Sequence, residues 1–254
     1  MMPIALITGT TAGIGAASAK ILAENGYDLI LNGRRNDRLE EQSRQLTNQY
    51  GIQTKIMHVD IRDHEEVEKY IANLSSEWNS IDLLINNAGL AAGLSSIESG
   101  SIDHWNRMID TNIKGLLHVT KYVTPLLKNT KGHIVNIGSI AGKEVYPNGN
   151  VYCGTKHMVD ALNKAMRREL AEFGVRVTSI NPGAVETEFS VVRLDGNFEK
   201  AKKVYNGFEN LVAQDIADAI WFAVSRPKHV NINELIIMPS AQPAAGEVIR
   251  NKGL

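Results

Sequence analysis

Tyr152 and Lys156 have the residue types and the spacing of an acid–base pair. They stand four positions apart in the stretch 139–156, which begins with Ser139. If a helix begins near Val151, this spacing places both side chains on one face, one turn apart. An ammonium group a few ångströms from a phenol favours the phenolate and lowers the pKa of the phenol. A tyrosine tuned in this way can donate or accept a proton near neutral pH, and the Ser139 hydroxyl could bond the same substrate oxygen.

The same spacing also fits a solvated helix face, so the chemistry depends on a cofactor site elsewhere in the chain. The apolar residues 3–8 predict a buried parallel strand, which a glycine-rich turn and an alanine-rich helical pattern follow. Glycines let such a turn approach a pyrophosphate closely, and the helix amino terminus offers free N–H groups to it. We therefore predict a dinucleotide site, although a glycine-rich turn without a ligand has the same pattern. The residues predicted to bind in this turn are Gly9, Thr11, Gly13, Ile14 and Gly15.

The end of the second predicted strand indicates which form of the cofactor binds. Residues 27–32 form this strand, and Gly33, Arg34 and Arg35 follow it. NAD-binding proteins usually place an acidic residue here to bond the ribose 2′-hydroxyl, whereas an arginine accommodates a 2′-phosphate. The alternative is a solvated arginine pair at a helix start, which is disfavoured because cations are poorly placed at that end. The sequence therefore predicts NADP(H), with Arg34 and Arg35 at the phosphate.

Three further turns after predicted strands complete the cofactor site. Asp60 follows strand 53–59 and suits the adenine amino group, with Ile61 beside the ring; the alternative is a helix N-cap. The turns after strands 81–86 and 175–180 carry small residues and a proline, which would let the backbone approach the ribose and grip a carboxamide. The residues predicted to bind there are Asn87, Ala88, Gly89, Pro182, Gly183, Val185 and Thr187.

Strand and helix patterns alternate along the chain. Besides the elements above, helices are predicted at 37–50, 63–78, 102–118, 198–205 and 214–224 and after Tyr152, and strands at 133–137 and 234–238. Seven strands in this alternation predict one domain over residues 1–254, a Rossmann-like doubly wound α/β fold with a parallel sheet and helices on both faces. The polar residues 188–210 predict a mobile lid, and residues 240–254 predict a tail without a core pattern of its own.

Composition excludes several classes of function. The 254 residues carry a formal net charge of −1, one cysteine and seven histidines. This charge gives no footprint for nucleic acid, and no stretch approaches the roughly twenty apolar residues that span a membrane. The histidines are scattered without a ligand spacing, so no metal site is predicted. The lone cysteine, Cys153, and an amino terminus without a signal-peptide pattern predict a cytoplasmic location.

Four motifs, in register from the first strand to the last, resemble those of the short-chain dehydrogenase/reductase family. They are TGTTAGIG at 8–15, NNAG at 86–89, the set Ser139, Tyr152 and Lys156, and PGAVET at 182–187. Within the family, GRR at 33–35, IDTN at 109–112 and NIGS at 136–139 are similar to the NADP-dependent 3-hydroxy acid dehydrogenases, with the sulfoacetaldehyde reductases close by. The resemblance implies an NADP-dependent oxidoreductase acting on CH–OH donors, and a homotetramer.

The resemblance also implies a role for each matched residue. Tyr152 would be the general acid toward a carbonyl and the base in the reverse reaction. Lys156 would lower the pKa of Tyr152 and hold the nicotinamide ribose. Ser139 would bond the substrate oxygen as charge develops on it. Asn112, a polar residue in the otherwise apolar pattern of helix 102–118, would anchor the water of a proton relay that reaches Lys156.

The sequence supports a short anionic aldehyde or hydroxy acid as substrate, of the malonic semialdehyde or sulfoacetaldehyde type. Arg193, in the predicted lid, is the candidate for the carboxylate or sulfonate because its fork suits oxyanions. Tyr146 and Asn150 are candidates for further bonds, and Arg250 in the tail is a weaker one. Three alternatives remain open at this point. They are a broad carbonyl reductase, a nucleotide-sugar epimerase or dehydratase, and an NADP-binding module without catalysis.

Overall fold

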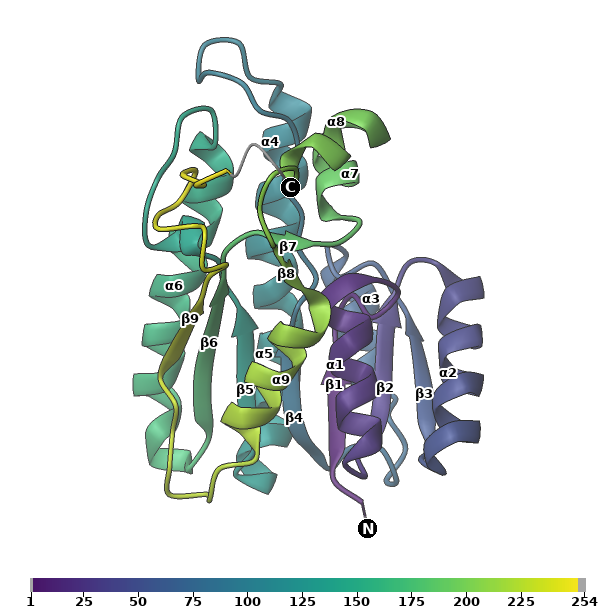
Figure 1. Ribbon diagram of the computed structural model, residues 1–254. Helices are drawn as coiled ribbons and strands as arrows, with labels where there is room; N and C mark the ends of the chain where they lie inside the picture. Colours follow the sequence, from purple (N-terminus) through teal and green to yellow (C-terminus); the bar gives the residue numbers. More distant parts are fainter. Residues whose placement is uncertain (1, 251–254) are drawn as a thin grey trace.

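A seven-stranded parallel sheet forms the centre of the computed structural model, which describes residues 2–250 (Figure 1). Its strands are β1 (Ile4–Ile7), β2 (Asp28–Gly33), β3 (Thr54–His58), β4 (Ile81–Asn86), β5 (His133–Ile137), β6 (Arg176–Pro182) and β9 (Glu234–Ile237). They lie in the order β3-β2-β1-β4-β5-β6-β9, and each neighbouring pair is parallel. The order reverses at β1 and β4, which opens a crevice at the carboxyl ends of these strands.

Helices cover both faces of the sheet (Figure 1). Strand β1 shows why: Ile4 and Leu6 point into one core cluster, and Ala5 and Ile7 point into the other. A strand that is buried on both faces reads as a continuous apolar run, which is the pattern seen in the sequence. The predicted fold class is therefore confirmed. One face carries α1 (Gly13–Glu24), α2 (Asn36–Tyr50) and α9 (Ala213–Val224), and the other carries α3 (His64–Ala72), α5 (Leu116–Thr130) and α6 (Asn150–Leu170).

Two predicted helices have different bounds in the structure. The helix predicted at 63–78 ends at Ala72, where the Asn73 side chain donates to the Lys69 carbonyl at 2.6 Å. The helix predicted at 102–118 is instead α4 (Ile102–Ile109), a π-helical turn and then α5, which runs on to Thr130. Burial of its inner face against the sheet keeps α5 intact, although Pro125 lies inside it and proline removes a helix hydrogen bond.

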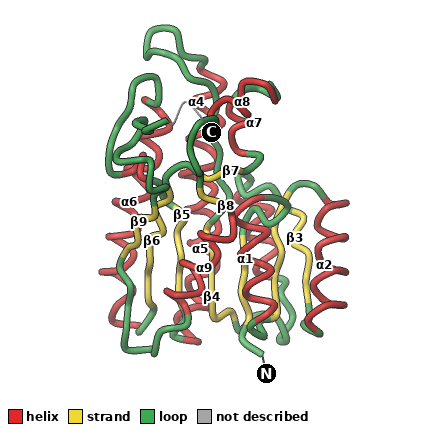
Figure 2. Tube along the Cα trace, viewed as in Figure 1, coloured by secondary structure: helices red, strands yellow, loops and turns green. Residues whose placement is uncertain are grey.

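The predicted lid lies above the carboxyl ends of the strands, where most of the long loops gather (Figure 2). It contains α7 (Phe189–Arg193) and α8 (Phe198–Val204), and the short strands β7 (Val185–Glu186) and β8 (Leu211–Val212) pair beside it. The described part of the tail first packs near Glu144, which accepts from the Ala245 N–H at 2.7 Å, and reaches the lid at Arg250. Arg250 donates to the Val204 carbonyl at 3.0 Å, at the end of α8. The rest of the predicted tail, residues 251–254, lies outside the described residues.

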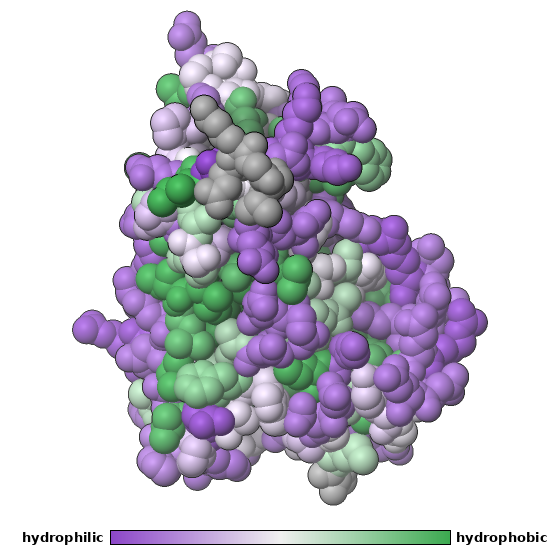
Figure 3. Space-filling model, in the orientation of Figure 1, coloured by the Kyte–Doolittle hydropathy of each residue, from purple (hydrophilic) through white to green (hydrophobic). Residues whose placement is uncertain are grey.

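Hydrophobic side chains are exposed over α9 and the edge strand β9 (Figure 3). Phe222 of α9 and Ile236 of β9 keep 46% and 49% of their surface exposed. Within residues 2–250, no helix is both long enough and apolar enough to cross a membrane.

Candidate active site

A cavity of about 720 Å³ opens at the carboxyl ends of the strands and extends under the lid. It is of the size that small-molecule and cofactor sites have in proteins. Of the residues predicted to bind the cofactor, those that line it are Gly9, Thr11, Gly13, Ile14, Arg34, Arg35, Asp60, Ile61, Asn87, Ala88, Gly89, Tyr152, Lys156, Pro182, Gly183, Val185 and Thr187. The tertiary structure thus brings together residues that are spread over most of the chain.

Gly15 is the one predicted cofactor residue that packs beneath the cavity instead of lining it. A Cβ atom there would lie 2.2 Å from the Gly9 carbonyl oxygen and 2.5 Å from Asn87 Nδ2. That amide nitrogen donates to the Thr8 carbonyl at 2.8 Å and to the Gly9 carbonyl at 3.1 Å. Gly15 therefore allows the close packing of helix α1 against the turn, and Asn87 fixes the turn to the neighbouring strand.

The glycine-rich turn fits a diphosphate. Helix α1 begins at Gly13 directly behind the cavity wall, and its N-cap residue, Ala12, has no polar side chain to cap the first N–H groups. Uncapped N–H groups at the positive end of a helix are a ready anion site. Gly9 has φ +72° and Gly13 has φ +54°, so side chains are disfavoured there by the backbone conformation as well. Arg34 and Arg35 line the adjoining wall, and the whole set fits a dinucleotide with a 2′-phosphate.

Asp60 lies in the cavity wall but is largely committed to other side chains. Arg62 holds its carboxylate with bonds of 3.0 and 2.6 Å, and Arg34 lies 3.8 Å away. Burial raises the pKa of Asp60, but the hydrogen bonds from Arg62 and the charge of Arg34 hold it below its usual value. The alternative role as a helix N-cap is wrong, because Asp63 caps α3. The predicted bond to adenine stays a prediction.

Ser139, Tyr152 and Lys156 meet at the other end of the cavity. Ser139 follows strand β5, and its hydroxyl accepts from the Ala141 N–H at 3.1 Å. Tyr152 and Lys156 lie in the first turns of α6, on the face that is buried. The Lys156 ammonium group donates to the Ile137 carbonyl at 2.8 Å, which ties the helix to the end of β5. The three side chains are therefore held by adjoining elements, as the strand–turn–helix pattern predicted.

The pKa of Tyr152 is raised in this structure, which differs from the sequence prediction. Burial raises it most, the neighbouring Tyr146 raises it further, and hydrogen bonding to Ser139 and the charge of Arg193 lower it. Lys156 is not among the groups that shift it, and its ammonium group donates to the Ile137 carbonyl. Tyr152 is therefore protonated at neutral pH, which suits a proton donor.

Lys156 has a pKa that burial lowers to about 8. The side chain is only 7% exposed, and a buried ammonium group loses much of its hydration. Because its pKa lies close to physiological pH, Lys156 gives up a proton far more readily than a solvated lysine does. This property suits a residue at the end of a proton relay.

Asn112 lies in the π-helical turn Asp110–Gly115. Its side-chain oxygen accepts from the Leu90 N–H at 2.8 Å, while its nitrogen donates to the Leu90 carbonyl at 2.8 Å and to Thr155 Oγ1 at 3.1 Å. The side chain thus clamps the loop after β4 to the helix of Tyr152. Its predicted role as the anchor of a relay water stays a prediction. No pattern in the sequence indicates the π-helical turn, a feature common at functional sites.

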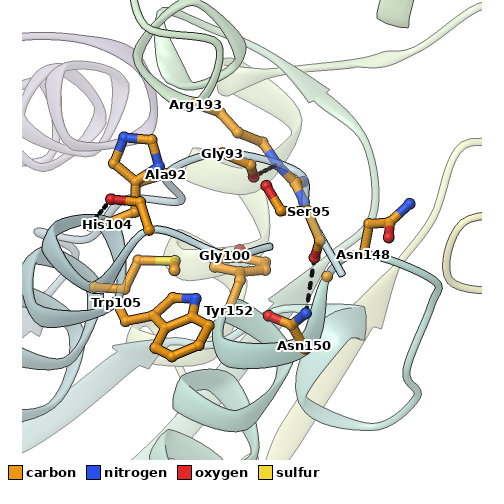
Figure 4. Close-up of a pocket in the computed structure, with 13 residues that line it drawn as sticks. Ala92, Gly93, Ser95, Gly100, His104, Trp105, Asn148, Asn150, Tyr152 and Arg193 are labelled. Atoms are coloured by element: carbon orange, nitrogen blue, oxygen red, sulfur yellow. Dashed lines mark hydrogen bonds between the residues drawn. The ribbon is translucent and has the colours of Figure 1, made fainter. Parts of the chain in front are cut away.

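Arg193 extends from α7 into a small pocket beside Gly93 (Figure 4). Its Nε donates to the Gly93 carbonyl at 3.4 Å, and its guanidinium group lies 5.4 Å from the Tyr146 ring and 5.6 Å from the Tyr152 ring. In the described part of the chain, the buried Nη2 of Arg193 has no hydrogen-bond partner. The structure therefore brings Arg193 and Tyr146 to Tyr152, as predicted from the sequence.

Asn150 lines the same small pocket, but its side chain is occupied (Figure 4). Its nitrogen donates to the Ser95 carbonyl at 2.8 Å, and its oxygen accepts from the Val151 N–H at 2.7 Å. Asn150 thus starts helix α6 and holds the loop over the pocket. Asn150 does not line the large cavity. A bond from its amide to the substrate would require one of these contacts to break.

The chain matches the family model for short chain dehydrogenases over residues 3–197. It is 43% identical over 245 residues to an NADP-dependent 3-hydroxy acid dehydrogenase of Salmonella typhi, covering 96% of this chain and 97% of that protein. It is also 43% identical over 242 residues to a serine 3-dehydrogenase of Agrobacterium fabrum, covering 95% of each. The structure superposes with a TM-score of 0.91 on the closed form of a serine dehydrogenase complexed with NADP+, at 41% identity, covering 98% of this chain and all of that one.

The chain belongs to the short-chain dehydrogenase family. The predicted resemblance and the predicted enzyme class are confirmed: this short-chain dehydrogenase is an oxidoreductase that acts on CH–OH donors. Among residues 2–250, no group of three or more His, Cys, Asp or Glu side chains is placed to hold a metal ion.

Sequence reasoning missed several residues of this dehydrogenase that contact the predicted ones. Thr155 accepts from Asn112, and Arg38 and Arg35 both donate to Glu188. The only sequence signal for Arg38 is its position three residues after Arg35, in the first turn of the helix predicted at 37–50. Contacts across 150 residues, such as Arg38 to Glu188, leave no mark in the local sequence.

Proposed function

We propose that this dehydrogenase reduces short anionic aldehydes with NADPH and, in reverse, oxidises the matching hydroxy acids or hydroxy sulfonates. The observation that carries the proposal is the buried Nη2 of Arg193, which lacks a hydrogen-bond partner within residues 2–250. A buried polar group without a partner is costly, and an always-charged guanidinium group is the natural partner of an oxyanion. A substrate carboxylate or sulfonate would supply the missing bond next to Tyr152.

The prediction of NADP(H) as the cofactor is confirmed by the relatives. The Salmonella typhi protein is named as NADP-dependent, and the superposed serine dehydrogenase is complexed with NADP+. In this chain, Arg34 and Arg35 would hold the 2′-phosphate and the turn at Gly9–Gly13 would hold the diphosphate, at the cavity wall described above. When bound, the cofactor supplies the hydride.

The roles proposed for the catalytic residues follow from their bonds. Ser139 and Tyr152 would both direct a hydroxyl at the substrate oxygen, and the raised pKa of Tyr152 keeps its proton available for a developing alkoxide. Lys156 would return a proton to Tyr152 through the ribose and the water chain that the family resemblance implies. Asn112 would hold that chain in place by fixing Leu90 and Thr155. In the oxidation direction Tyr152 must first lose its proton, so we expect oxidation to accelerate as the pH rises.

The named relatives favour a carboxylate over a sulfonate. They are a 3-hydroxy acid dehydrogenase and a serine 3-dehydrogenase, and both names denote substrates with a carboxylate group. Sulfoacetaldehyde stays a candidate because Tyr146 lies beside Arg193 and could bond a third oxygen.

The test is NADPH consumption with malonic semialdehyde, sulfoacetaldehyde and a neutral aldehyde of similar size. We expect Arg193→Met to raise KM for the preferred anion about tenfold to a hundredfold and to leave the neutral aldehyde nearly unchanged. Lys202→Met is the matched control, because it removes an exposed cation of the same lid that lies on α8. Equal losses for the anionic and neutral aldehydes would remove Arg193 from the substrate site and leave a broad carbonyl reductase.

We also infer that a second copy of the chain covers the apolar surface over α9 and β9. Phe222 and Ile236 are exposed on an edge strand and its neighbouring helix, where pairing of two sheets would bury them. The predicted homotetramer and the predicted cytoplasmic location remain proposals. Sedimentation of the wild type and of Ile236→Glu tests the homotetramer, since the variant should no longer form the oligomer that the wild type forms.

A further inference from the structure

A bridged cluster of charges stands beside the predicted 2′-phosphate arginines. The two carboxylate oxygens of Glu188 accept from Arg35 Nη1 at 2.8 Å and from Arg38 Nη1 at 2.7 Å. Arg35 also donates to Thr11 Oγ1 through Nε at 3.1 Å and through Nη2 at 2.8 Å. Hydrogen bonds from Arg38 and Arg35 lower the pKa of Glu188, so its carboxylate is charged at neutral pH.

This cluster concentrates positive charge where an anion is expected. Arg35 is the N-cap residue of α2, and Arg38 lies in the first turn of that 15-residue helix. The helix amino terminus is itself positive, so two cations there repel it and each other unless an anion is present. In this structure the anion is Glu188. It lies 150 residues away in the sequence and comes from the lid.

The location of Glu188 connects the cofactor site to the substrate site. Thr11, Arg35 and Glu188 all line the large cavity. Glu188 immediately precedes α7, the helix that ends in Arg193. The charged side chains of the cluster are 40% to 47% exposed, so an incoming anion can reach them from solvent.

We propose that Glu188 occupies the 2′-phosphate site as an internal anion, and that Arg38 is a further guanidinium group of that site. The inference rests on NADP(H) as the cofactor. A phosphate monoester carries about −1.5 to −2 charges and three acceptor oxygens, so it outcompetes the single charge of a carboxylate for the two arginines. Binding of NADP(H) then displaces Glu188, whose release frees the first residue of the lid.

Glu188 should act differently on the binding of NADPH and of NADH. NADH has no 2′-phosphate and leaves the bridge between Glu188 and the two arginines in place. NADPH must break that bridge, so Glu188 weakens NADPH binding and has no effect on NADH binding. Glu188 therefore reduces the ratio by which the enzyme binds NADPH more tightly than NADH, in addition to holding the lid.

The test measures dissociation constants for NADPH and NADH by titration calorimetry, with no turnover involved. We expect Glu188→Gln to lower the Kd for NADPH about two- to tenfold and to leave the Kd for NADH unchanged. Glu186→Gln is the matched control, because Glu186 is an exposed residue of the same segment that contacts Asn210 instead of the arginines. An unchanged or raised Kd for NADPH in Glu188→Gln would overturn the internal-anion role.

Arg38→Met separates the two parts of the proposal. If Arg38 binds the phosphate, this variant raises the Kd for NADPH about tenfold and leaves the Kd for NADH unchanged. If the Kd for NADPH falls or stays the same, Arg38 only holds Glu188 and its place in the phosphate site is wrong. A wild type that binds NADH as tightly as NADPH would instead contradict the cofactor assignment itself, which distinguishes the two failures.

Discussion

The two ends of the cavity are held by different kinds of contact. At the glycine-turn end, the Asn87 side chain bonds the Thr8 and Gly9 carbonyls, and Thr8 Oγ1 accepts from the Asn87 and Ala88 N–H groups at 3.0 and 2.9 Å. At the lid end, a main-chain bond from the Gly93 N–H to the Arg193 carbonyl at 2.9 Å is joined by side chains that reach between the lid and the rest of the domain. Arg193 meets Gly93 at 3.4 Å, and an exposed ion pair with Arg35 and Arg38 holds Glu188.

This difference indicates that the diphosphate cradle is preformed, whereas the lid is held largely by side-chain contacts that a ligand can replace, at the 2′-phosphate site as well as at the substrate site. Hydrogen bonds that satisfy main-chain groups inside the fold cost much to break because these groups would be left unpaired. Exposed ion pairs contribute little and exchange partners readily. Binding and turnover should therefore be separable by mutation, and four variants test this from the largest expected effect to the smallest.

Tyr152→Phe should lower kcat about a hundredfold to ten-thousandfold, because the proton donor is lost. The Kd for NADPH should stay nearly unchanged, since the cradle lies at the other end. Tyr122→Phe is the control, because its hydroxyl bonds Glu68 on the outer helices. Stopped-flow turnover with calorimetric Kd values measures both quantities, and retained turnover would contradict the general acid.

Lys156→Met should change how the unfolding free energy depends on pH. The folded-state pKa of Lys156 is lowered from 10.5 to about 8, so the unfolded state binds more protons between these pH values and wild-type stability rises with pH there. This lowering corresponds to about 3 kcal/mol, and it is lost in the variant. Urea unfolding at pH 7 and at pH 10 should show that the unfolding free energy rises less with pH in the variant than in the wild type. An equal rise in unfolding free energy in both proteins would show that burial does not lower the pKa of Lys156.

Gly15→Ala should weaken cofactor binding about tenfold to a hundredfold, because a Cβ atom placed 2.2 Å from the Gly9 carbonyl must displace the turn. At saturating NADPH, kcat should approach the wild-type value, since Tyr152 and Ser139 are unaffected. This is the reverse of the Tyr152→Phe result. An unchanged Kd for NADPH would mean that the turn is less rigid than the buried bonds of Asn87 imply.

Gly154→Ala should have the smallest effect, a stabilisation of about 0.5 to 1 kcal/mol with activity retained. Gly154 lies in α6 between Tyr152 and Lys156, and a Cβ atom there would meet no other atom within 4 Å. Thermal unfolding and steady-state kinetics measure the two quantities. Lost activity would show that α6 must bend near the catalytic pair.

Much of the cofactor site could be predicted because each part follows a strand by a few residues. Nearby residues alone are enough to recognise the glycine turn after β1, the arginines after β2 and the Asn87–Gly89 turn after β4. Parallel strands then bring these three groups to one edge of the sheet. The prediction that Lys156 lowers the pKa of Tyr152 failed, because the spacing of four residues does not reveal that the Ile137 carbonyl takes the ammonium group. The extension of α5 past Pro125 was missed because packing, not helix propensity, sustains it.

The sequence by itself determined the fold class, the family and the cofactor, and it predicted Ser139, Tyr152 and Lys156 as the catalytic residues, since all of these rest on glycines, charges and spacings within single strand–turn–helix units. Only the tertiary structure decided where the long side chains point. The bonds of Asn112 to Leu90, the contact of Arg193 with Gly93 and the bridge from Glu188 to Arg35 and Arg38 all join segments far apart in the chain. Such contacts depend on how the loops pack over the sheet, and the local sequence around each residue does not show which distant segment it will meet.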